Sequence, residues 1–238
     1  MTTMTLLPGW AMSTTVLQPL AAALSESLPD ATVNLTALPA IQLSSLETDL
    51  SSLAQQLTPG LLIGWSLGGM LAVQLHRRFP EHFPRVITLA SNACFVERND
   101  WPHAMARTDF KAFYQSYREE PQKTLKRFAL LATQGGPHAR QRAKDMPWDA
   151  LDDEQRLHAL AVLGMLDNRV ALRQPMAPLL HFLGENDALV PVAAAASLAQ
   201  VHGDSTVKIH PTASHMLPLE QPLWLAAEIT HWLEKQDV

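Results

Sequence analysis

Residues 61–70 read Leu61-Leu62-Ile63-Gly64-Trp65-Ser66-Leu67-Gly68-Gly69-Met70. The apolar run at 60–63 predicts a buried strand, and the apolar spacing over 67–79 predicts an amphipathic helix. The pattern Gly64-x-Ser66-x-Gly68 therefore falls at a strand-to-helix turn. Such a turn strains the serine backbone and exposes its hydroxyl, while the glycines avoid collision with the neighbouring strand and helix. We predict that Ser66 is a nucleophile; the alternative is a glycine-rich turn with an incidental serine.

The segments on either side of this turn alternate between strands and helices. Strands are predicted at 3–7, 31–38, 85–90, 178–184 and 206–210. Helices are predicted at 14–28, 43–57, 192–201 and 222–235. This alternation is typical of a parallel sheet with right-handed crossovers. We therefore expect an α/β fold with a mostly parallel central sheet flanked by helices.

The alternation stops between residues 91 and 173. This span has no clear strand pattern and predicts helices at 109–117, 121–132, 138–144 and 153–166. Proline-containing turns, not long linkers, stand at each end of it. We therefore predict a core formed by residues 1–97 and 174–238, with an all-helical cap of residues 98–173 inserted in it.

The predicted cap carries most of the positive charge. The 238-residue chain has a net charge of −5, yet residues 98–144 hold ten basic and four acidic side chains, a net +6. A local basic segment favours an acidic partner over a general affinity for nucleic acid. The alternative is an ordinary solvated helix face. Four of the basic residues form pairs at i,i+4 spacing, which places each pair on one helix face: Lys123 with Arg127, and Arg140 with Lys144.

The remaining composition indicates where the protein works. Cys94 is the single cysteine, so an internal disulfide is excluded and a reducing compartment is favoured. We expect Cys94 to be a small buried side chain and not a nucleophile. The N-terminus lacks the basic segment of a secretory signal, and the longest mostly apolar run, 61–73, is too short to span a bilayer. We expect a cytoplasmic monomer without nucleic-acid or membrane partners.

A serine nucleophile needs a base within hydrogen-bond reach and an acid to orient that base. His215 lies in the loop between the last predicted strand and the last helix, at the same carboxyl edge of the sheet as Ser66. Nine other histidines compete, and we expect structural or surface roles for them. Asp187 follows the preceding strand and is the predicted acid, with Glu185 as the alternative. The order Ser66, Asp187, His215 is typical of one hydrolase fold.

The oxyanion of an acyl-transfer intermediate needs two preorganised N–H donors. The backbone N–H of Leu67 lies at a helix N-terminus, where the helix dipole also favours negative charge. The loop after the first strand offers the second donor, from Trp10. Trp10 and Trp65 are also placed to form walls of an acyl pocket, and plain core packing is the alternative for both.

Taken together, these residues make the sequence resemble the α/β-hydrolase family over essentially the whole chain. Ser66, Asp187 and His215 match the catalytic triad of that family, and Pro8-Gly9-Trp10 occupies its oxyanion loop. The chain is most similar to the pimeloyl-acyl-carrier-protein methyl ester carboxylesterases of biotin synthesis. That closer resemblance rests on Gly64-Trp65-Ser66-Leu67-Gly68-Gly69, Leu89-Ala90-Ser91-Asn92-Ala93-Cys94-Phe95, Trp101-Pro102 and Lys126-Arg127-Phe128-Ala129-Leu130-Leu131.

The resemblance implies a serine carboxylesterase that needs no cofactor or metal. Its substrate would be the pimeloyl methyl ester carried on acyl carrier protein, and its alcohol product would be methanol. The acidic carrier would dock on Lys123, Arg127, Arg140 and Lys144. The implied substrate-binding residues are Trp10, Ser66, Leu67, Phe128, Ala129, Leu130, Leu131, Ala132 and His215.

Two features depart from the family pattern. Pro8 stands where members often have histidine before the oxyanion glycine, but the donors are backbone groups, so the chemistry does not depend on it. The antiparallel edge strands usual in the fold are not evident before residue 3, which leaves the strand count open.

Two other functions stay open on the sequence. One is a broad short-chain esterase or thioesterase with the same triad and no carrier partner. The other is a non-catalytic binding protein, because hydrolase folds also serve as ligand receptors. The complete triad in the expected order argues against a receptor.

Overall fold

A computed structural model describes residues 2–173, 177–201 and 205–236. Its centre is a six-stranded sheet in the order β2-β1-β3-β4-β5-β6, and all of its strand pairs are parallel. This confirms the predicted fold class. The strands are β1 (Thr3–Leu7), β2 (Thr32–Leu35), β3 (Leu61–Trp65), β4 (Arg85–Leu89), β5 (Leu179–Gly184) and β6 (Thr206–His210). The predicted strand at 31–38 is shorter than expected, because β2 is an edge strand that pairs only along β1.

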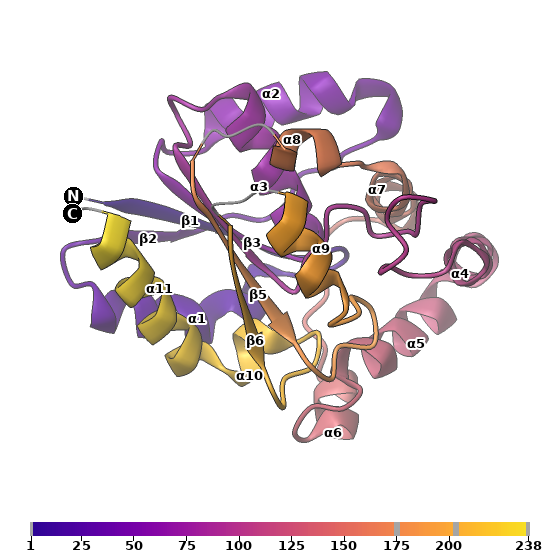
Figure 1. Ribbon diagram of the computed structural model, residues 1–238. Helices are drawn as coiled ribbons and strands as arrows, with labels where there is room; N and C mark the ends of the chain where they lie inside the picture. Colours follow the sequence, from indigo (N-terminus) through magenta and orange to yellow (C-terminus); the bar gives the residue numbers. More distant parts are fainter. Residues whose placement is uncertain (1, 174–176, 202–204, 237–238) are drawn as a thin grey trace.

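Helices cover both faces of this sheet (Figure 1). Helices α1 and α11 pack against each other on one face, and α2 and α3 lie on the other. Buried leucines along α1, α2 and α3 face the strands, as the apolar spacing of these segments predicts. The core helices are α1 (Gln18–Ser27), α2 (Leu46–Gln56), α3 (Leu67–Arg78), α9 (Ala194–Val201), α10 (Leu217–Glu220) and α11 (Pro222–Gln236). The first turns of the segments predicted at 14–28 and 43–57 are 3-10 helices, at Thr14–Leu17 and Leu43–Ser45.

The helices between β4 and β5 lie mainly beyond the carboxyl ends of the strands, at the right of Figure 1. They are α4 (Arg107–Glu119), α5 (Pro121–Thr133), α6 (Ala139–Lys144), α7 (Asp153–Met165) and α8 (Arg169–Arg173). The short helices α8 and α10 were not predicted, because four or five residues are too few to reveal a helical period. The predicted end of the cap at residue 173 adjoins 174–176, which are outside the described residues.

Buried polar contacts fasten the base of the cap to the core. The backbone N–H of Asn168 donates to Ala93 O at 2.8 Å, and its side-chain amide donates to Met70 O at 3.0 Å. The side-chain amide of Gln74 on α3 donates to Oδ1 of the Asn168 side chain. Asn168 is almost completely buried, so these bonds are shielded from water. The segment at the end of the cap is therefore bonded to α3, the helix that follows Ser66.

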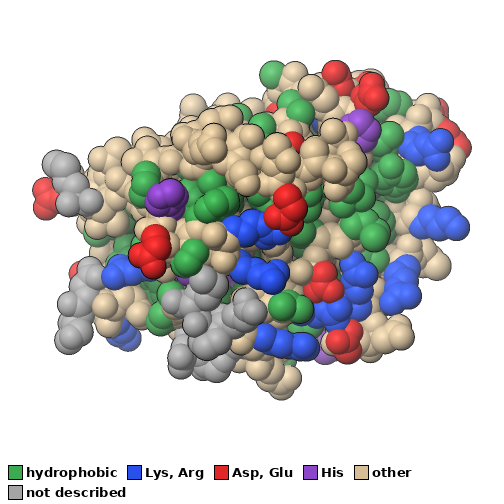
Figure 2. All heavy atoms as spheres, turned by 90° about the horizontal axis from the view of Figure 1, so that it is seen from above, with side chains coloured by type: hydrophobic (Ala, Val, Ile, Leu, Met, Phe, Trp, Pro, Cys, Tyr) green, Lys and Arg blue, Asp and Glu red, His purple; other side chains and the backbone are tan. Residues whose placement is uncertain are grey.

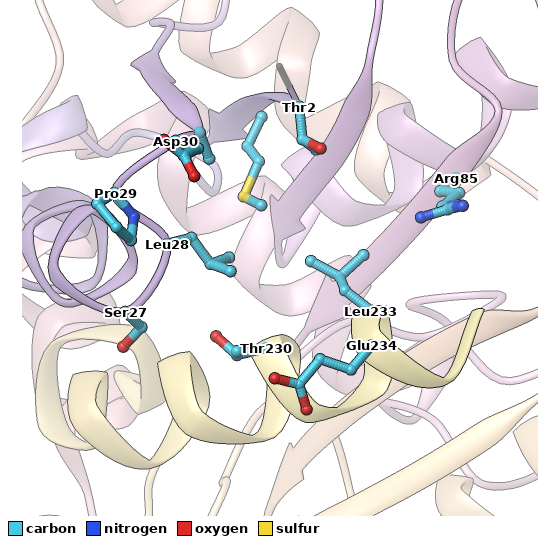
Figure 3. A pocket seen from close by; sticks show the side chains of 11 residues that line it. Thr2, Ser27, Leu28, Pro29, Asp30, Arg85, Thr230, Leu233 and Glu234 are labelled. Atoms are coloured by element: carbon cyan, nitrogen blue, oxygen red, sulfur yellow. The ribbon is translucent and has the colours of Figure 1, made fainter. Parts of the chain in front are cut away.

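A cavity at the opposite edge of the sheet lies away from Ser66 (Figure 3). It is lined by the beginning of β1, the end of α1 and the last turns of α11, including Asp30, Arg85 and Glu234. These are the amino ends of the strands, whereas ligands of parallel α/β sheets bind at the carboxyl ends. No helix in the described part of the chain is long and apolar enough to cross a bilayer.

Candidate active site

Ser66 stands between the end of β3 and the first turn of α3, at φ 54° and ψ −118°. This positive φ is costly for a residue with a side chain and persists only where surrounding contacts enforce it. Here the Ser66 N–H donates to Leu89 O at 2.9 Å, and its carbonyl accepts from Gly69 N and from Ser91 Oγ. The predicted strained turn is therefore present, held by β4 and the segment after it.

The glycines of the turn are required by close backbone approach. A Cβ atom at Gly64 would lie 2.3 Å from the carbonyl oxygen of Gly68, and one at Gly68 would lie 2.4 Å from that of Pro8. These neighbours are backbone atoms, which cannot rotate away as a side chain could. The spacing Gly64-x-Ser66-x-Gly68 thus allows β3, α3 and the loop after β1 to meet at Ser66.

The structure brings the three predicted triad side chains together. His215 Nε2 lies 3.0 Å from Ser66 Oγ, and His215 Nδ1 lies 2.7 Å from Asp187 Oδ2. The second oxygen of Asp187 accepts from the backbone N–H groups of Leu189 and Val190, at 2.8 and 2.9 Å. An ionised Asp187 requires the Nδ1–H tautomer, which leaves Nε2 free to accept the Ser66 proton. Glu185, the alternative acid, is exposed to solvent and is not part of this chain of contacts.

The histidine loop is fastened on both sides. Trp65 donates from Nε1 to His215 O at 2.8 Å, and its ring centroid is 5.5 Å from the imidazole. Trp65 therefore supports His215, which agrees with the packing alternative and not with a pocket wall: it does not line the apolar cavity beside Trp10 and Phe128. Glu220 on α10 accepts from Ser214 N and Ser214 Oγ at 2.8 and 2.7 Å. Sequence reasoning missed Glu220, since a contact across six residues of loop and short helix leaves no pattern.

Other histidines have partners away from Ser66. His181 Nδ1 lies 2.6 Å from Thr88 Oγ1 between two strands, and His76 Nδ1 lies 2.6 Å from Phe83 O. His202 is outside the described residues.

The loop after β1 lies directly against the nucleophile. A Cβ atom at Gly9 would lie 3.1 Å from Ser66 Cβ. Two residues later the chain turns at Ala11, which has a positive φ of 59°. Leu67 is the first residue of α3, where backbone N–H groups have no partner within the helix. Both proposed donors, the N–H groups of Trp10 and Leu67, therefore belong to segments that flank Ser66.

A wholly apolar cavity adjoins this loop. The Trp10 side chain forms one wall and packs edge-to-face on Phe128 and Tyr117, with ring centroids 5.0 and 5.3 Å apart. The lining comes from the core loops and from α4, α5 and α7: Trp10, Phe95, Met105, Phe113, Phe128, Leu131, Leu160, Leu163 and Leu189. The free space inside it is small, about 20 Å³, because the lining side chains nearly fill it. Its lining presents apolar surface to a hydrocarbon chain and no polar side chain to an ionised group.

Of the predicted substrate-binding residues on α5, only some line this cavity. Phe128 and Leu131 line it, whereas Ala129 and Ala132 are buried elsewhere in the helix packing. Leu130 is 56% exposed, because a position two residues from Phe128 lies on nearly the opposite face of a helix. The lining residues of α4 and α7 were not predicted, since the helix spacing alone does not tell which cap helices face one another.

The predicted basic residues on α5 and α6 reach solvent. Lys123, Arg127, Arg140 and Lys144 are all exposed, and the two helices pack against each other. Lys123 also pairs with Glu120 at 2.9 Å, which offsets part of its charge. Figure 2 shows one face of the molecule, on which Lys and Arg side chains gather toward its right-hand end.

Cys94 is the other candidate nucleophile, and its surroundings make it unreactive. The side chain is completely buried, and its Sγ donates to Asp167 Oδ1 at 3.3 Å. Burial, followed by the negative charge of Asp167, raises the pKa of the Cys94 thiol to about 11. A protonated thiol is a poor nucleophile. In the described residues no group of three or more His, Cys, Asp or Glu side chains is arranged to hold a metal.

The parallel sheet and the strained serine turn define a class of protein. The sequence matches the alpha/beta hydrolase family over residues 6–228, and the chain belongs to this family. The crystal structure of a bromoperoxidase from Bacillus anthracis superposes with a TM-score of 0.81, covering 98% of this chain and 92% of the other. At 16% identity that likeness supports the fold alone.

More similar sequences come from biotin synthesis. The chain is 38% identical over 235 residues to the biotin biosynthesis bifunctional protein BioHC of Cellvibrio japonicus, covering 96% of this chain and 47% of the relative. The chain therefore spans about half the length of that relative. It is 33% identical over 237 residues to the pimeloyl-[acyl-carrier protein] methyl ester esterase of Pectobacterium carotovorum, covering 93% of this chain and 90% of the relative.

Proposed function

We propose that this chain is a serine carboxylesterase that hydrolyses the methyl ester of pimeloyl-acyl-carrier protein in biotin synthesis. The observation that carries the proposal is the relay from Asp187 through His215 to Ser66 Oγ, at 2.7 and 3.0 Å, beside an apolar cavity. The substrate is supported by the names of the relatives from Cellvibrio japonicus and Pectobacterium carotovorum. In this role Ser66 is the nucleophile, His215 the general base and Asp187 the residue that orients it.

The first half of the reaction forms an acyl-enzyme. Ser66 Oγ bonds to the ester carbonyl carbon while its proton moves to His215 Nε2. The carbonyl electron pair becomes an oxyanion, which the N–H groups of Trp10 and Leu67 stabilise. The intermediate then expels the methoxy group, which takes the proton from His215 and leaves as methanol.

The second half returns the enzyme to its starting state. A water molecule gives a proton to His215 Nε2 and attacks the acyl carbon. The new tetrahedral intermediate breaks its bond to Ser66 Oγ, which recovers the proton. Asp187 stays ionised throughout and stabilises the imidazolium formed in each half. The free carboxylate that results is poorly matched to an apolar cavity, which favours its release.

The cap completes the proposed function. We assign residues 98–173 to it and the rest of the chain to the hydrolase core. Phe128 and Leu131 of α5 contact the hydrocarbon part of the substrate, while Lys123, Arg127, Arg140 and Lys144 attract the acidic carrier. The buried, protonated Cys94 fits a reducing compartment, and we place the enzyme in the cytoplasm as a monomer.

A comparison of two substrates tests the proposed function. We expect purified enzyme to hydrolyse the pimeloyl methyl ester on acyl carrier protein with a much higher kcat/KM than p-nitrophenyl acetate. Hydrolysis of the small ester alone would leave a general esterase and remove the carrier from the assignment. If neither ester reacts, a ligand-binding protein becomes the better account.

A further inference from the structure

The loop after β1 is fastened to the cap as well as to the sheet. Asp149 N donates to Ala11 O at 3.0 Å, and Ser13 N donates to Pro147 O at 2.9 Å. Met12 forms an antiparallel bridge with Trp148 between these two bonds. Residues 11–13 therefore pair with residues 147–149, which connect α6 to α7. The backbone that follows the Trp10 N–H is held by a segment more than 130 residues away in the sequence.

One residue of α7 joins the two ends of this arrangement, through its side chain at one end and its backbone carbonyl at the other. Arg156 donates from Nε to Asp149 Oδ1 at 2.7 Å and from Nη2 to the Asp149 carbonyl at 2.8 Å. The carbonyl of Arg156 itself accepts from Trp10 Nε1, also at 2.7 Å. The loop is thus tied to Arg156 twice, through the indole of Trp10 and through the segment that pairs with residues 11–13.

The Arg156 side chain is held in a largely dry environment. Its side chain is 9% exposed and that of Asp149 is 13% exposed. Burial acts to lower the pKa of Arg156, but the hydrogen bonds and charges of Asp149 and Tyr117 together outweigh it, so the pKa is raised. A buried charge that loses its partner is strongly destabilised. Arg156 and Asp149 therefore keep one arrangement, and the segment 147–149 keeps its place with them.

We propose that Arg156, together with Asp149, is a positioning residue that aims the Trp10 N–H at the oxyanion. The proposal rests on the ester hydrolysis described above. An oxyanion donor has to stand about 2.7–3.1 Å from the oxygen whose charge develops, and a shift of about 1 Å costs on the order of 100-fold in rate. Arg156 does not touch the substrate in this account; it acts through the loop that carries Trp10.

The test replaces Arg156 by methionine, which has a similar reach and no donor. Arg169→Met is the matched control, because Arg169 also lies in the cap region and pairs with two aspartates, Asp167 and Asp100. Within the described residues its side chain makes no hydrogen bond or ion pair with the loop after β1. Three quantities are measured: kcat and KM for p-nitrophenyl acetate, the affinity for phenylboronic acid, and hydrogen exchange at the Ser13 amide. The boronic acid probes the oxyanion donors because it forms a charged tetrahedral adduct with a serine.

R156M is expected to lower kcat on the order of 10-fold to 100-fold and to lower the affinity for phenylboronic acid in parallel. KM should change less than about 3-fold. The Ser13 amide should exchange faster. Arg156→Lys should lie between, since an ammonium keeps the charge but lacks the planar fork that presents two donors to Asp149. Arg169→Met should lower the unfolding temperature and leave kcat, phenylboronic acid affinity and Ser13 exchange unchanged.

A folded R156M or Arg156→Lys enzyme with wild-type kcat, boronic acid affinity and Ser13 exchange would overturn the proposal. The outcome is separable from that of the proposed function. A wild-type enzyme that hydrolyses p-nitrophenyl acetate but not the carrier ester loses its assigned substrate, while the three measurements on Arg156 keep their meaning. Should the wild type hydrolyse neither ester, Ser13 exchange still decides whether Arg156 holds the loop.

Discussion

The turn at Ser66 and the helical cap both contact the loop after β1, but different contacts hold them. Around Ser66 the chain packs backbone against backbone, with Gly64 and Gly68 so close to their neighbours that no Cβ fits. In the cap, side chains supply the close contacts: the Phe110 ring lies against the backbone of Gly164, and Phe113 and Phe128 pack on Trp10 of the loop after β1. Side chains can change rotamer and backbone atoms of a sheet cannot.

The residues proposed for catalysis and those proposed for substrate binding are therefore held by different kinds of packing. Ser66, His215 and Leu67, the proposed nucleophile, base and oxyanion donor, stand at the carboxyl edge of the sheet. The walls of the cavity come largely from helices whose contacts can adjust to a substrate. The loop after β1 belongs to both regions, since it lies against Ser66 on one side and pairs with residues 147–149 on the other. Variants with a substitution in one region test whether the other region responds.

The largest effect is expected from Ser66→Ala. Removing the hydroxyl should lower kcat on the order of 10⁴-fold to 10⁶-fold, since the triad acts as a unit, while the fold is retained. Steady-state hydrolysis of p-nitrophenyl acetate and the far-ultraviolet circular dichroism spectrum measure both. Cys94→Ala is the control, because it removes the other candidate nucleophile and should keep kcat near the wild-type value. Near wild-type activity of Ser66→Ala would place the nucleophile elsewhere.

The second prediction compares glycines of the two regions. Gly64→Ala should destabilise the protein by about 3 kcal/mol or more, because the new Cβ meets the Gly68 backbone at 2.3 Å. Gly164→Ala in α7 places a Cβ equally close to Phe110, but that ring can move, and alanine favours a helix by about 1 kcal/mol. Its net effect should therefore be much smaller. Urea unfolding of both variants measures the free energies; equal losses would contradict the contrast between rigid and adjustable packing.

The third prediction concerns the exposed side of the cap. The double variant Lys123→Glu/Arg127→Glu should lower kcat/KM for the carrier-bound ester about 10-fold to 100-fold by repelling an acidic carrier. The rate with p-nitrophenyl acetate should not change. Arg77→Glu/Lys235→Glu is the matched control: it makes the same change in net charge at exposed sites outside the cap. An equal loss in both double variants, or a loss with both substrates, would remove the docking role of α5.

The smallest effect is expected at the base of the cap. The hydrogen bond from Arg169 holds the pKa of Asp167 well below its usual range, which outweighs the opposing effect of burial. A carboxylate whose pKa is lower in the folded state stabilises the fold above its unfolded pKa and loses this contribution as the pH falls through the folded pKa. Because the Asp167 side chain is 32% exposed, screening limits the effect to about 1 kcal/mol.

Asp167→Asn should therefore lower the unfolding temperature at pH 7, and its difference from the wild type should shrink as the pH falls below about 4. Thermal unfolding at pH 7, 4 and 3 measures the difference. A difference that stays constant over this range would mean that the charge of Asp167 does not contribute.

The sheet and the triad contacts could be predicted because local sequence specifies them. Ser66, Asp187 and His215 each follow a recognisable strand, and parallel strands bring their carboxyl ends to one edge. The cavity could be predicted only in part. Phe128 and Leu131 were found by their family resemblance, but Phe113, Leu160 and Leu163 depend on which cap helices face one another.

Two supporting contacts left no signal in the sequence. Glu220 accepts from Ser214 across a loop, and Arg156 reaches Asp149 and the Trp10 indole through the arrangement of α7. Both contacts are set by tertiary packing. Neither an i,i+4 spacing nor an apolar period would have indicated them.

The most direct measurement is to locate the reactive serine. The folded enzyme would be treated with a fluorophosphonate and analysed by intact-mass and peptide mass spectrometry. We expect one equivalent of phosphonate, carried on the peptide that contains Ser66, with none on Ser66→Ala. Labelling of another residue, or no labelling of a folded wild-type enzyme, would contradict the assignment of Ser66 as the nucleophile.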